Sequence, residues 1–531
     1  MKRILTTLLL ASLAAPLCGQ VTFERLLRAR DESGQWLTYS GAYDSQRYSK
    51  LDQVTKENVK NLKLKWVFQM PTTEKVEATP IVADGVMYLT QPPSTLVALD
   101  PRTGRPFWSS TYALPELLNV CCGRVNRGVA LLGDRLFMST LDSHLIALDA
   151  KSGSVVWDVA VEGAEPHKGY SGTVAPLAVK DKIVVGIAGG EYGVRGFLEA
   201  YDAATGKRAW RFYTTPGPGE PGHETWGGDS WKTGGGTTWV TGSYDPELNL
   251  VYWGTGNPAP DYNGDVRPGD NLYTDSVIAL DADTGKLKWH FQFTPHDVHD
   301  WDAVQVPVLA DIEFRGRQRK TMLWANRNSF FYVLDRETGE FLTGKPFVKQ
   351  TWAKGLDDQG RPIVAPGSET KVEGALVYPG VQGGTNWYSP SYSPRTKLFY
   401  LSVWDYANTY FLGDPTYSEG NRYLGSLPQR IPNDPGSGTI RAIDPQTATV
   451  KWTTEIFSKS MGGVLSTATD LLFACTDEGH FLALDALTGK ELWRASLGGR
   501  IANSPITYVV DGKQVVTVAA GSAYFTFELP E

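Results

Sequence analysis

The chain has 531 residues, with 51 Lys and Arg against 58 Asp and Glu, and its formal net charge of −7 is spread along the sequence without blocks. Proteins that bind nucleic acids need a basic face for the phosphate backbone, so this balance argues against a nucleic-acid partner. The 55 Gly, 32 Pro, 17 Trp and 24 Tyr residues are typical of short strands, tight turns and aromatic packing, and they predict a mainly β protein.

The first 19 residues have the layout of a secretory signal peptide. Lys2 and Arg3 precede an apolar run of about a dozen residues, and small residues follow it. The run is too short to cross a bilayer. A lipoprotein signal that uses Cys18 is the alternative, but proline and leucine precede this cysteine where such a signal prefers small residues. We therefore expect export to the periplasm and a single mature domain, residues 20–531.

A repeat of the form Ala-Leu-Asp-x-x-Thr-Gly-x-x-x-Trp organises the rest of the chain. Its six copies that keep both the Asp and the Trp are Asp100–Trp108, Asp149–Trp157, Asp202–Trp210, Asp281–Trp289, Asp444–Trp452 and Asp485–Trp493. A seventh copy at Asp335 lacks the Trp, and Trp66 resembles the closing strand of an eighth. Each copy has a strand, an Asp/Gly turn and a second strand that ends on a packing aromatic. Eight units predict an all-β fold, an eight-bladed β-propeller of four-stranded antiparallel blades.

The repeat spacing widens twice, between Trp210 and Trp289 and between Asp335 and Trp452. Propellers carry their function on loops at one face or in the central channel, so these insertions are candidate site loops. The Gly-rich segments of the chain lack the strand-turn-helix context of a dinucleotide fingerprint, which argues against nicotinamide binding.

The stretch "TPHDVHDWDA", residues 294–303, concentrates polar chemistry in one loop. It holds two of the seven histidines, His296 and His299, together with Asp297, Asp300 and Asp302. A His-x-x-His pair near aspartates could bind zinc or iron. The preferred interpretation is that the histidines are loop residues that form hydrogen bonds with neighbouring carboxylates.

Five further stretches accompany this loop: "WLTYSGAYDSQRYSKLDQV", "NVCCGRVNRG", "AGGEYGVRG", "GGGTTW" and "WGTGNPAPDYN". Together and in this order they closely resemble the pyrroloquinoline-quinone (PQQ)-dependent alcohol dehydrogenases, the methanol and ethanol quinoprotein family. The resemblance runs from about residue 31 to the C-terminus, a span in which several unrelated motifs occur together. That family is an eight-bladed propeller with quinone and metal in its central channel, in agreement with the repeat count.

The resemblance implies a metal site. Glu191, Asn257 and Asp300 match the protein ligands of the family's metal, and such hard oxygen donors suit calcium or a similar ion. Asp302 resembles the lanthanide-dependent members, because an added carboxylate suits a trivalent ion. The alternative is that Asp302 turns away and accepts main-chain hydrogen bonds in its loop. A lanthanide is therefore favoured, with Ca²⁺ as the other choice.

The resemblance also implies which residues hold PQQ. These are Glu77, Cys121, Cys122, Arg127, Thr173, Gly189, Gly190, Thr237, Trp239, Arg327 and Asn386. Cys121 and Cys122 match a disulfide over one face of the quinone, with two reduced thiols as the alternative, and Trp239 matches an aromatic under the other face. Arginine is the natural partner for the carboxylates of such a cofactor. Ala188 and Met461 depart from the family pattern and weaken any claim that methanol is the substrate.

The implied reaction is hydride transfer from a small alcohol. Asp300 takes the hydroxyl proton as general base, the metal polarises the quinone carbonyl, and Arg327 stabilises the developing charge. The sequence has no Cys-x-x-Cys-His and ends soon after its last blade, so we expect no haem and a separate periplasmic cytochrome c as electron acceptor. Whether the protein is a monomer or a homodimer stays open.

Two other functions fit the same repeats. One is a non-enzymatic scaffold like the outer-membrane assembly lipoproteins, which share eight blades and similar repeats. The other is a quinone-dependent sugar or aldehyde dehydrogenase, since the fold does not specify the substrate. Glu191, Asn257, Asp300 and the pair Cys121 and Cys122 favour an enzyme, because a scaffold has no reason to keep them together.

Overall fold

The computed structural model describes residues 21–530, so the predicted signal peptide lies outside the described residues. Helical structure within this range consists of one short α-helix and five 3-10 turns: α1 (Phe23–Leu27), η1 (Val59–Asn61), η2 (Pro166–Lys168), η3 (Gly190–Tyr192), η4 (His223–Thr225) and η5 (Ser230–Thr233). None of these described helices is long and apolar enough to span a bilayer. The rest of the ordered structure is β, as the composition predicts.

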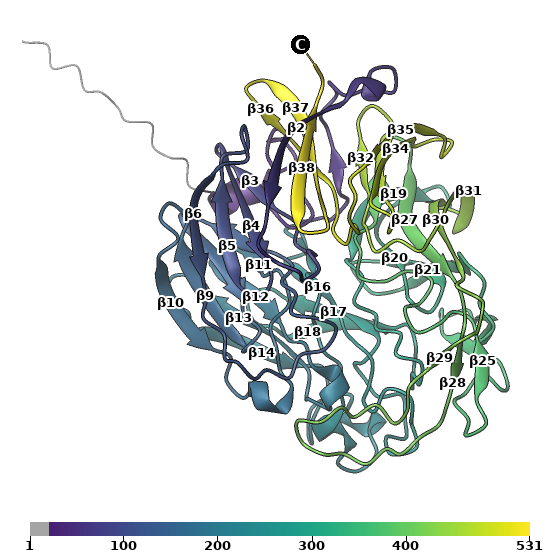
Figure 1. Ribbon diagram of the computed structural model, residues 1–531. Coiled ribbons are helices and arrows are strands. Elements are labelled where there is room, and N and C mark those ends of the chain that lie inside the picture. The colour runs from purple at the N-terminus through teal and green to yellow at the C-terminus, as the bar shows by residue number, and fades with distance from the viewer. Residues whose placement is uncertain (1–20, 531) are drawn as a thin grey trace, which may run out of the picture.

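Eight sheets of at least four strands, counted over residues 21–530, stand around a common axis, and the chain passes round the ring in order (Figure 1). The first five blades are β3 (Ile81–Ala83), β4 (Val86–Gln91), β5 (Thr95–Leu99) and β6 (Pro106–Thr111); β7 (Ala130–Leu132), β8 (Arg135–Ser139), β9 (His144–Asp149) and β10 (Val155–Ala160); β11 (Leu177–Val179), β12 (Lys182–Gly186), β13 (Phe197–Asp202) and β14 (Arg208–Tyr213); β15 (Ser243–Asp245), β16 (Leu250–Gly254), β17 (Ser276–Asp281) and β18 (Leu287–Gln292); and β19 (Val308–Phe314), β20 (Arg317–Ala325), β21 (Phe330–Asp335) and β22 (Phe341–Pro346).

The last three blades are β26 (Ser391–Ser393), β27 (Leu398–Asp405), β30 (Ser437–Asp444) and β31 (Thr449–Ile456); β32 (Leu465–Thr467), β33 (Leu471–Cys475), β34 (His480–Asp485) and β35 (Glu491–Ser496), with β1 (Tyr48–Ser49) added beside β32; and β36 (Ile506–Val510), β37 (Lys513–Ala520), β38 (Ala523–Glu528) and β2 (Lys63–Gln69). Two small sheets, built from β23 (Ala353–Leu356) and β24 (Pro362–Val364) and from β25 (Ala375–Val377), β28 (Asn408–Tyr410) and β29 (Gln429–Arg430), lie in the inserted loops. The predicted fold is confirmed.

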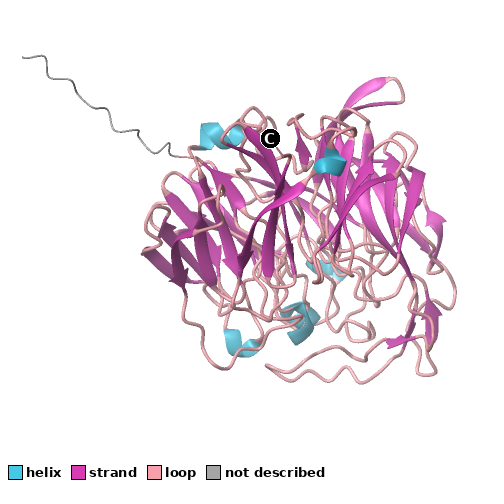
Figure 2. Ribbon diagram, turned by 45° about the horizontal axis from the view of Figure 1, so that its top comes forward, coloured by secondary structure: helices cyan, strands magenta, loops and turns pink. Residues whose placement is uncertain are grey.

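Burial falls from the first strand of a blade to the fourth. In the first two blades, for example, the first strands β3 and β7 are mostly buried, whereas the fourth strands β6 and β10 have only exposed and half-buried residues. Such a pattern is typical of an outer strand with one face on the neighbouring blade and one face in solvent. Figure 2 shows the strands as separate sheets, with long loops gathered at one end of the molecule.

The ring closes by pairing the two ends of the domain. β2 from the N-terminal part pairs antiparallel with β38, with Trp66 opposite Thr526, and it is the outer strand of the last blade. Trp66 therefore lies on the closing strand that the sequence predicts. This pairing joins the last blade to a strand that lies more than 400 residues earlier in the chain.

The repeat's Trp and Gly meet between blades. The indole Nε1 of Trp66 donates to the carbonyl of Pro101 at 2.9 Å, and that of Trp210 donates to the carbonyl of Ala282 at 3.1 Å. In each case a turn of the next blade lies under the ring. A Cβ on the turn glycine would come within 2.5 to 3.0 Å of the ring in six pairs, which are Gly104 with Trp66, Gly153 with Trp108, Gly206 with Trp157, Gly285 with Trp210, Gly339 with Trp289 and Gly489 with Trp452. The repeat therefore keeps glycine because the ring leaves no room for a side chain.

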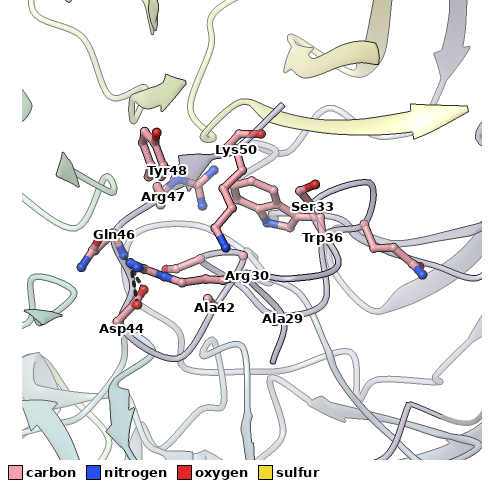
Figure 3. A pocket seen from close by; sticks show the side chains of 14 residues that line it. Ala29, Arg30, Ser33, Trp36, Ala42, Asp44, Gln46, Arg47, Tyr48 and Lys50 are labelled. Atoms are coloured by element: carbon pink, nitrogen blue, oxygen red, sulfur yellow. Dashed lines mark hydrogen bonds and ion pairs between the residues drawn. The ribbon is translucent and has the colours of Figure 1, made fainter. Parts of the chain in front are cut away.

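The segment 36–49 runs alongside the innermost strands and hydrogen-bonds to several blades. The amide of Tyr244 donates to the carbonyl of Tyr43, and the amide of Ser466 donates to the carbonyl of Arg47. Beside this segment is a small pocket lined by residues 29–50, in which Arg30 pairs with Asp44 at 2.6 Å (Figure 3). The pocket contains none of the predicted site residues.

Candidate active site

Many predicted site residues lie on the segments that lead into the innermost strands, whereas Glu191, Asn257 and Arg327 lie on loops between the second and third strands of their blades. The residues on the entering segments include Glu77 before β3, Arg127 before β7, Thr173 before β11, Thr237 and Trp239 before β15, Asp302 before β19 and Asn386 before β26. Since the innermost strands surround one axis, the segments that enter them come together near that axis. Residues far apart in the sequence therefore come together.

Carboxylates and one arginine form the centre of the site. Nη1 of Arg327 pairs with Oδ2 of Asp302, and Nη2 of Arg327 lies 3.5 Å from Oδ1 of Asp300. Oδ1 of Asp302 accepts a hydrogen bond from the main-chain N–H of Asn257 at 2.9 Å, and Tyr262 donates its hydroxyl to Oδ2 of Asp300 at 3.2 Å. The fold thus brings Asp300, Asp302, Arg327 and Asn257 together.

Burial and mutual repulsion dominate the electrostatics of this cluster. Burial raises the pKa of Asp300 well above its usual range, Asp302 and Glu191 add to the rise, and Arg327 opposes it. The pKa of Glu191 is raised by burial and then by Asp302. The pKa of Arg327 is itself raised, because Asp300 and Asp302 outweigh the lowering effect of burial. The cluster has one guanidinium for several carboxylates, an excess of negative charge that a bound cation would offset.

Glu191 reaches the cluster through a tight glycine turn. It lies in η3 behind Gly189, which has φ of +119° and whose added Cβ would meet the carbonyl oxygen of Gly169 at 2.2 Å. A Cβ on Gly190 would contact Oγ1 of Thr237 at 3.4 Å. Gly189 is therefore required by its backbone conformation and by the close approach of Gly169, whereas Gly190 could hold a Cβ in ordinary contact with Thr237; the turn places Glu191 beside the Thr237 segment.

A second group of residues surrounds Arg127. Its guanidinium pairs with Glu77 at 2.8 Å and lies over the rings of Trp239 and Trp387, 4.7 and 5.1 Å from their centroids. Its Nη1 is 3.4 Å from the carbonyl oxygen of Thr173. Arg127 therefore offers a buried cation beside a flat aromatic surface. Trp239 connects both groups, because a hydrogen bond from its side chain lowers the pKa of Asp302, which burial raises.

Asn386 is held by its own loop near this second group. Its side-chain amide donates to the carbonyl of Gln382 at 3.1 Å, and its Oδ1 accepts from the main chain of Trp387 at 2.8 Å. The main-chain N–H of Gly384 donates to the carbonyl of Arg327 at 3.0 Å. The loop of Asn386 is thus attached to the residue that pairs with both aspartates.

The adjacent cysteines form the predicted disulfide, and Cys122 has φ of +67°. Its Sγ lies 3.9 Å from Oε1 of Glu191. The sulfur atoms and this carboxylate are close enough to suggest a metal group, but disulfide sulfurs are not the thiolates that bind metals. The disulfide therefore borders the carboxylate cluster and is not part of its donor set.

Comparisons with known proteins identify the family. The model for PQQ, "Glucose/ethanol/alcohol dehydrogenase, beta-propeller domain", matches residues 36–349. The quinoprotein alcohol dehydrogenase PedH of Pseudomonas putida is 40% identical over 546 residues, which cover 98% of this chain and 91% of the relative. The chain belongs to the PQQ-dependent alcohol dehydrogenases. A relative named 1-butanol dehydrogenase (cytochrome c), from Thauera butanivorans, is 38% identical and covers 92% of this chain and 74% of its own length.

Solved structures of PQQ-dependent dehydrogenases share the fold. A europium-containing methanol dehydrogenase superposes with a TM-score of 0.90 at 33% identity, over 95% of this chain and all of its own. The quinohemoprotein alcohol dehydrogenase of Comamonas testosteroni superposes with a TM-score of 0.90 at 36% identity, over 96% of this chain and 84% of its own. Residues 436–529 also match the model "Outer membrane protein assembly factor BamB", which reflects the repeat shared with the scaffold propellers.

Both histidines of the 294–303 loop bond mainly to carbonyl oxygens. A ring nitrogen of His299 lies 2.8 Å from the carbonyl of Ser368, and one of His296 lies 2.8 Å from the carbonyl of Gly269. The sequence predicted hydrogen bonds from these histidines to neighbouring carboxylates. Among the described residues of the loop, the corresponding contact is that of His299 Nδ1, which lies 3.6 Å from Asp297. A zinc or iron site on these histidines finds no support among the described residues.

Motif comparison with this dehydrogenase family missed two residues of the site. Tyr262 contacts Asp300 through its hydroxyl. Asp261 is 1% exposed, and its Oδ1 has no hydrogen-bond partner. Both directly follow the "GTGNPAP" stretch that supplies Asn257, so proximity in the sequence was the available signal. Neither residue was weighed because the motif was matched only at its asparagine.

Proposed function

We propose that this chain oxidises a small alcohol by hydride transfer to PQQ, with Asp300 as the general base. One observation carries the proposal: Arg327 holds the carboxylates of Asp300 and Asp302 together, and Trp239 connects this cluster to the Arg127 group. A scaffold has no use for a buried, charge-rich cluster of this kind, because buried charges are expensive unless they serve binding or catalysis.

The chemistry of the residues fits PQQ. Trp239 offers an aromatic face for a flat cofactor, and the disulfide at Cys122 borders the same cluster through its contact with Glu191. Arg127 and Arg327 are the cations that a tricarboxylate needs, and arginine binds carboxylates with two parallel hydrogen bonds. Glu191, Asn257 and Asp300 offer hard oxygen donors for Ca²⁺ or a lanthanide ion.

When bound, the quinone with its metal supplies a hydride acceptor. Asp300 would remove the hydroxyl proton of the alcohol, a role that needs a carboxylate within hydrogen-bond reach of the substrate. The hydroxyl of Tyr262 and the guanidinium of Arg327 contact different oxygens of Asp300 and orient it. Arg327 also places a positive charge where negative charge develops.

Asp302 is the proposed contributor to the metal preference. An additional carboxylate strengthens the field around a trivalent ion more than that around a divalent one, so we propose that a lanthanide is preferred over Ca²⁺. Both of its oxygens are engaged in the structure, one by the main chain of Asn257 and one by Arg327. Direct coordination would therefore require Arg327 to release Oδ2.

The proposed electron acceptor is a separate cytochrome c in the periplasm. Support comes from the relative whose name specifies cytochrome c and from the signal-like residues 1–19. The chain contains no Cys-x-x-Cys-His for covalent haem attachment, whereas one similar structure is a quinohemoprotein. We therefore propose that electrons leave this protein without a haem of its own.

A substrate panel tests the proposed function. The protein is loaded with PQQ and with either Ca²⁺ or La³⁺, and dye reduction is measured with primary alcohols, aldehydes and sugars. Turnover of primary alcohols above the other classes supports the proposal. Preference for a sugar or an aldehyde points to the second quinone-dependent function, and no turnover of any class with full quinone occupancy points to the scaffold.

A further inference from the structure

Asp261 is a buried carboxylate that the proposed mechanism does not use. Its side chain is 1% exposed, yet Oδ1 has no hydrogen-bond partner, and residues 21–530 contain no ion pair to it. A buried carboxylate oxygen without a partner is costly unless a ligand offsets its charge. Its position therefore calls for a bound group.

The neighbours of Asp261 include the proposed metal ligands. The largest effects on its pKa, after burial, come from the carboxylates of Asp300 and Glu191, which raise it, while a hydrogen bond from the Asn257 side chain lowers it. All three neighbours belong to the proposed metal ligand set. Asp261 also adjoins Tyr262, whose hydroxyl donates to Asp300 at 3.2 Å, and it lies four residues after Asn257, so this loop brings its carboxylate to the proposed metal ligands.

The carboxylates of this cluster differ in how many of their oxygens are engaged. Asp302 has both oxygens engaged, by Arg327 and by the main-chain N–H of Asn257. Asp300 has Oδ2 bonded to Tyr262, and its Oδ1 lies 3.5 Å from Arg327. Oδ1 of Asp261 has no partner. In this arrangement Asp261 has an oxygen available for a cation that Asp302 lacks.

We propose that Asp261 is a further anionic ligand of the metal position and strengthens its preference for trivalent ions. The inference rests on the proposed function, because it assumes that Glu191, Asn257 and Asp300 hold the ion. Asp261 lies in the matched stretch "WGTGNPAPDYN", but the resemblance gave it no role. The proposal assigns to it part of the metal selectivity that the resemblance places on Asp302 alone.

Coulomb's law gives the expected size of the effect. The attraction between Asp261 and an ion is proportional to the ion's charge, so losing it weakens La³⁺ binding by 1.5 times as much free energy as Ca²⁺ binding. If Asp261→Asn weakens Ca²⁺ about tenfold, La³⁺ should weaken about thirtyfold, since the logarithms of the two factors scale in the same way.

Metal binding is the direct test. The full chain is loaded with PQQ, stripped of metal and titrated separately with Ca²⁺ and La³⁺, and bound metal is measured by elemental mass spectrometry after dialysis. The variants are Asp261→Asn and Glu191→Gln, with Asp265→Asn as the matched control. Asp265 is in the same loop and its side chain is exposed, so the same change there removes a charge without altering the site.

We expect Asp261→Asn to raise both dissociation constants, La³⁺ more than Ca²⁺, while Asp265→Asn changes neither by more than about twofold. We also expect the metal-free Asp261→Asn protein to melt no lower than wild type, because the amide removes a repelled charge. Equal affinities in Asp261→Asn and wild type, with Glu191→Gln weakened, would overturn the role of Asp261. Unchanged affinities in both variants would instead overturn the proposed metal position.

Discussion

Arg327 pairs with two carboxylates, Asp300 and Asp302, and so couples the positions of their side chains. Its guanidinium contacts Asp302 with one nitrogen and approaches Asp300 with the other. A planar guanidinium can do this because its donors form a rigid fork, which a lysine cannot reproduce. Any change to Asp302 therefore also changes how firmly Asp300 is held.

The metal preference can be tested at Asp302. We expect La³⁺ to support more alcohol oxidation than Ca²⁺ in the wild type, and Asp302→Ala to narrow or reverse that preference, because one negative charge is lost near the ion. Asp302→Asn is the matched variant, since its amide oxygen still accepts from the main chain of Asn257. Equal activation by both ions in all three proteins would show that this position does not select the metal.

The thiol of Cys475 is expected to be unreactive in the folded protein. It is free and fully buried in β33, and burial raises its pKa far above the usual range. Since the thiolate is the reactive form, we expect iodoacetamide at about pH 8 to leave this residue unlabelled until the protein is unfolded. Peptide mapping measures the label. Rapid modification of native protein would contradict the burial.

Among the elements, the turns of the repeat stabilise the contacts between blades. Gly153 has φ of +73°, and a Cβ there would lie 2.5 Å from the ring of Trp108. Gly512 has φ of +78°, but a Cβ there would meet nothing within 4 Å. Gly512 is therefore required only by its left-handed backbone, whereas Gly153 is required both by its backbone and by the lack of space beside Trp108.

Alanine at these two turns should therefore have different effects. Gly512→Ala should lose about 1 kcal/mol for the left-handed backbone, whereas Gly153→Ala should lose a further 1 to 3 kcal/mol, as is typical for an overpacked site. Thermal or urea denaturation measures both. Equal losses would mean that the Trp108 ring yields to the added methyl group.

The loop that holds the Cys121–Cys122 disulfide lies beside the carboxylate cluster. We expect replacement of both Cys121 and Cys122 by serine to weaken quinone retention or electron transfer while the propeller stays folded, because the loop borders Glu191 but belongs to no blade. Quinone absorbance after dialysis and dye-linked turnover are the measurements. Full retention and turnover, with the loss of the bridge verified, would reject this role.

At the scale of the whole molecule, the repeat was enough to predict the propeller, because each Asp, Gly and Trp has one place in a blade. Trp66 even predicted the closure by β2. The site was predictable only where a family motif marked it. The partners of Asp302 were not predictable, since they depend on Arg327 and on the main chain of Asn257, which the fold brings together from separate segments. The burial of Asp261 was not predictable either, because burial is a tertiary property.

Reduction of the bound quinone in a single turnover tests the central proposal most directly. Wild type and Asp300→Asn are loaded with PQQ and metal, mixed with a primary alcohol without a dye, and followed by quinone absorbance. The amide keeps the volume of the side chain and removes the base, so we predict that reduction slows by about a hundredfold or more at unchanged quinone occupancy. A rate within about tenfold of wild type, close to 1.4 kcal/mol in the barrier, would contradict the role of Asp300 as general base.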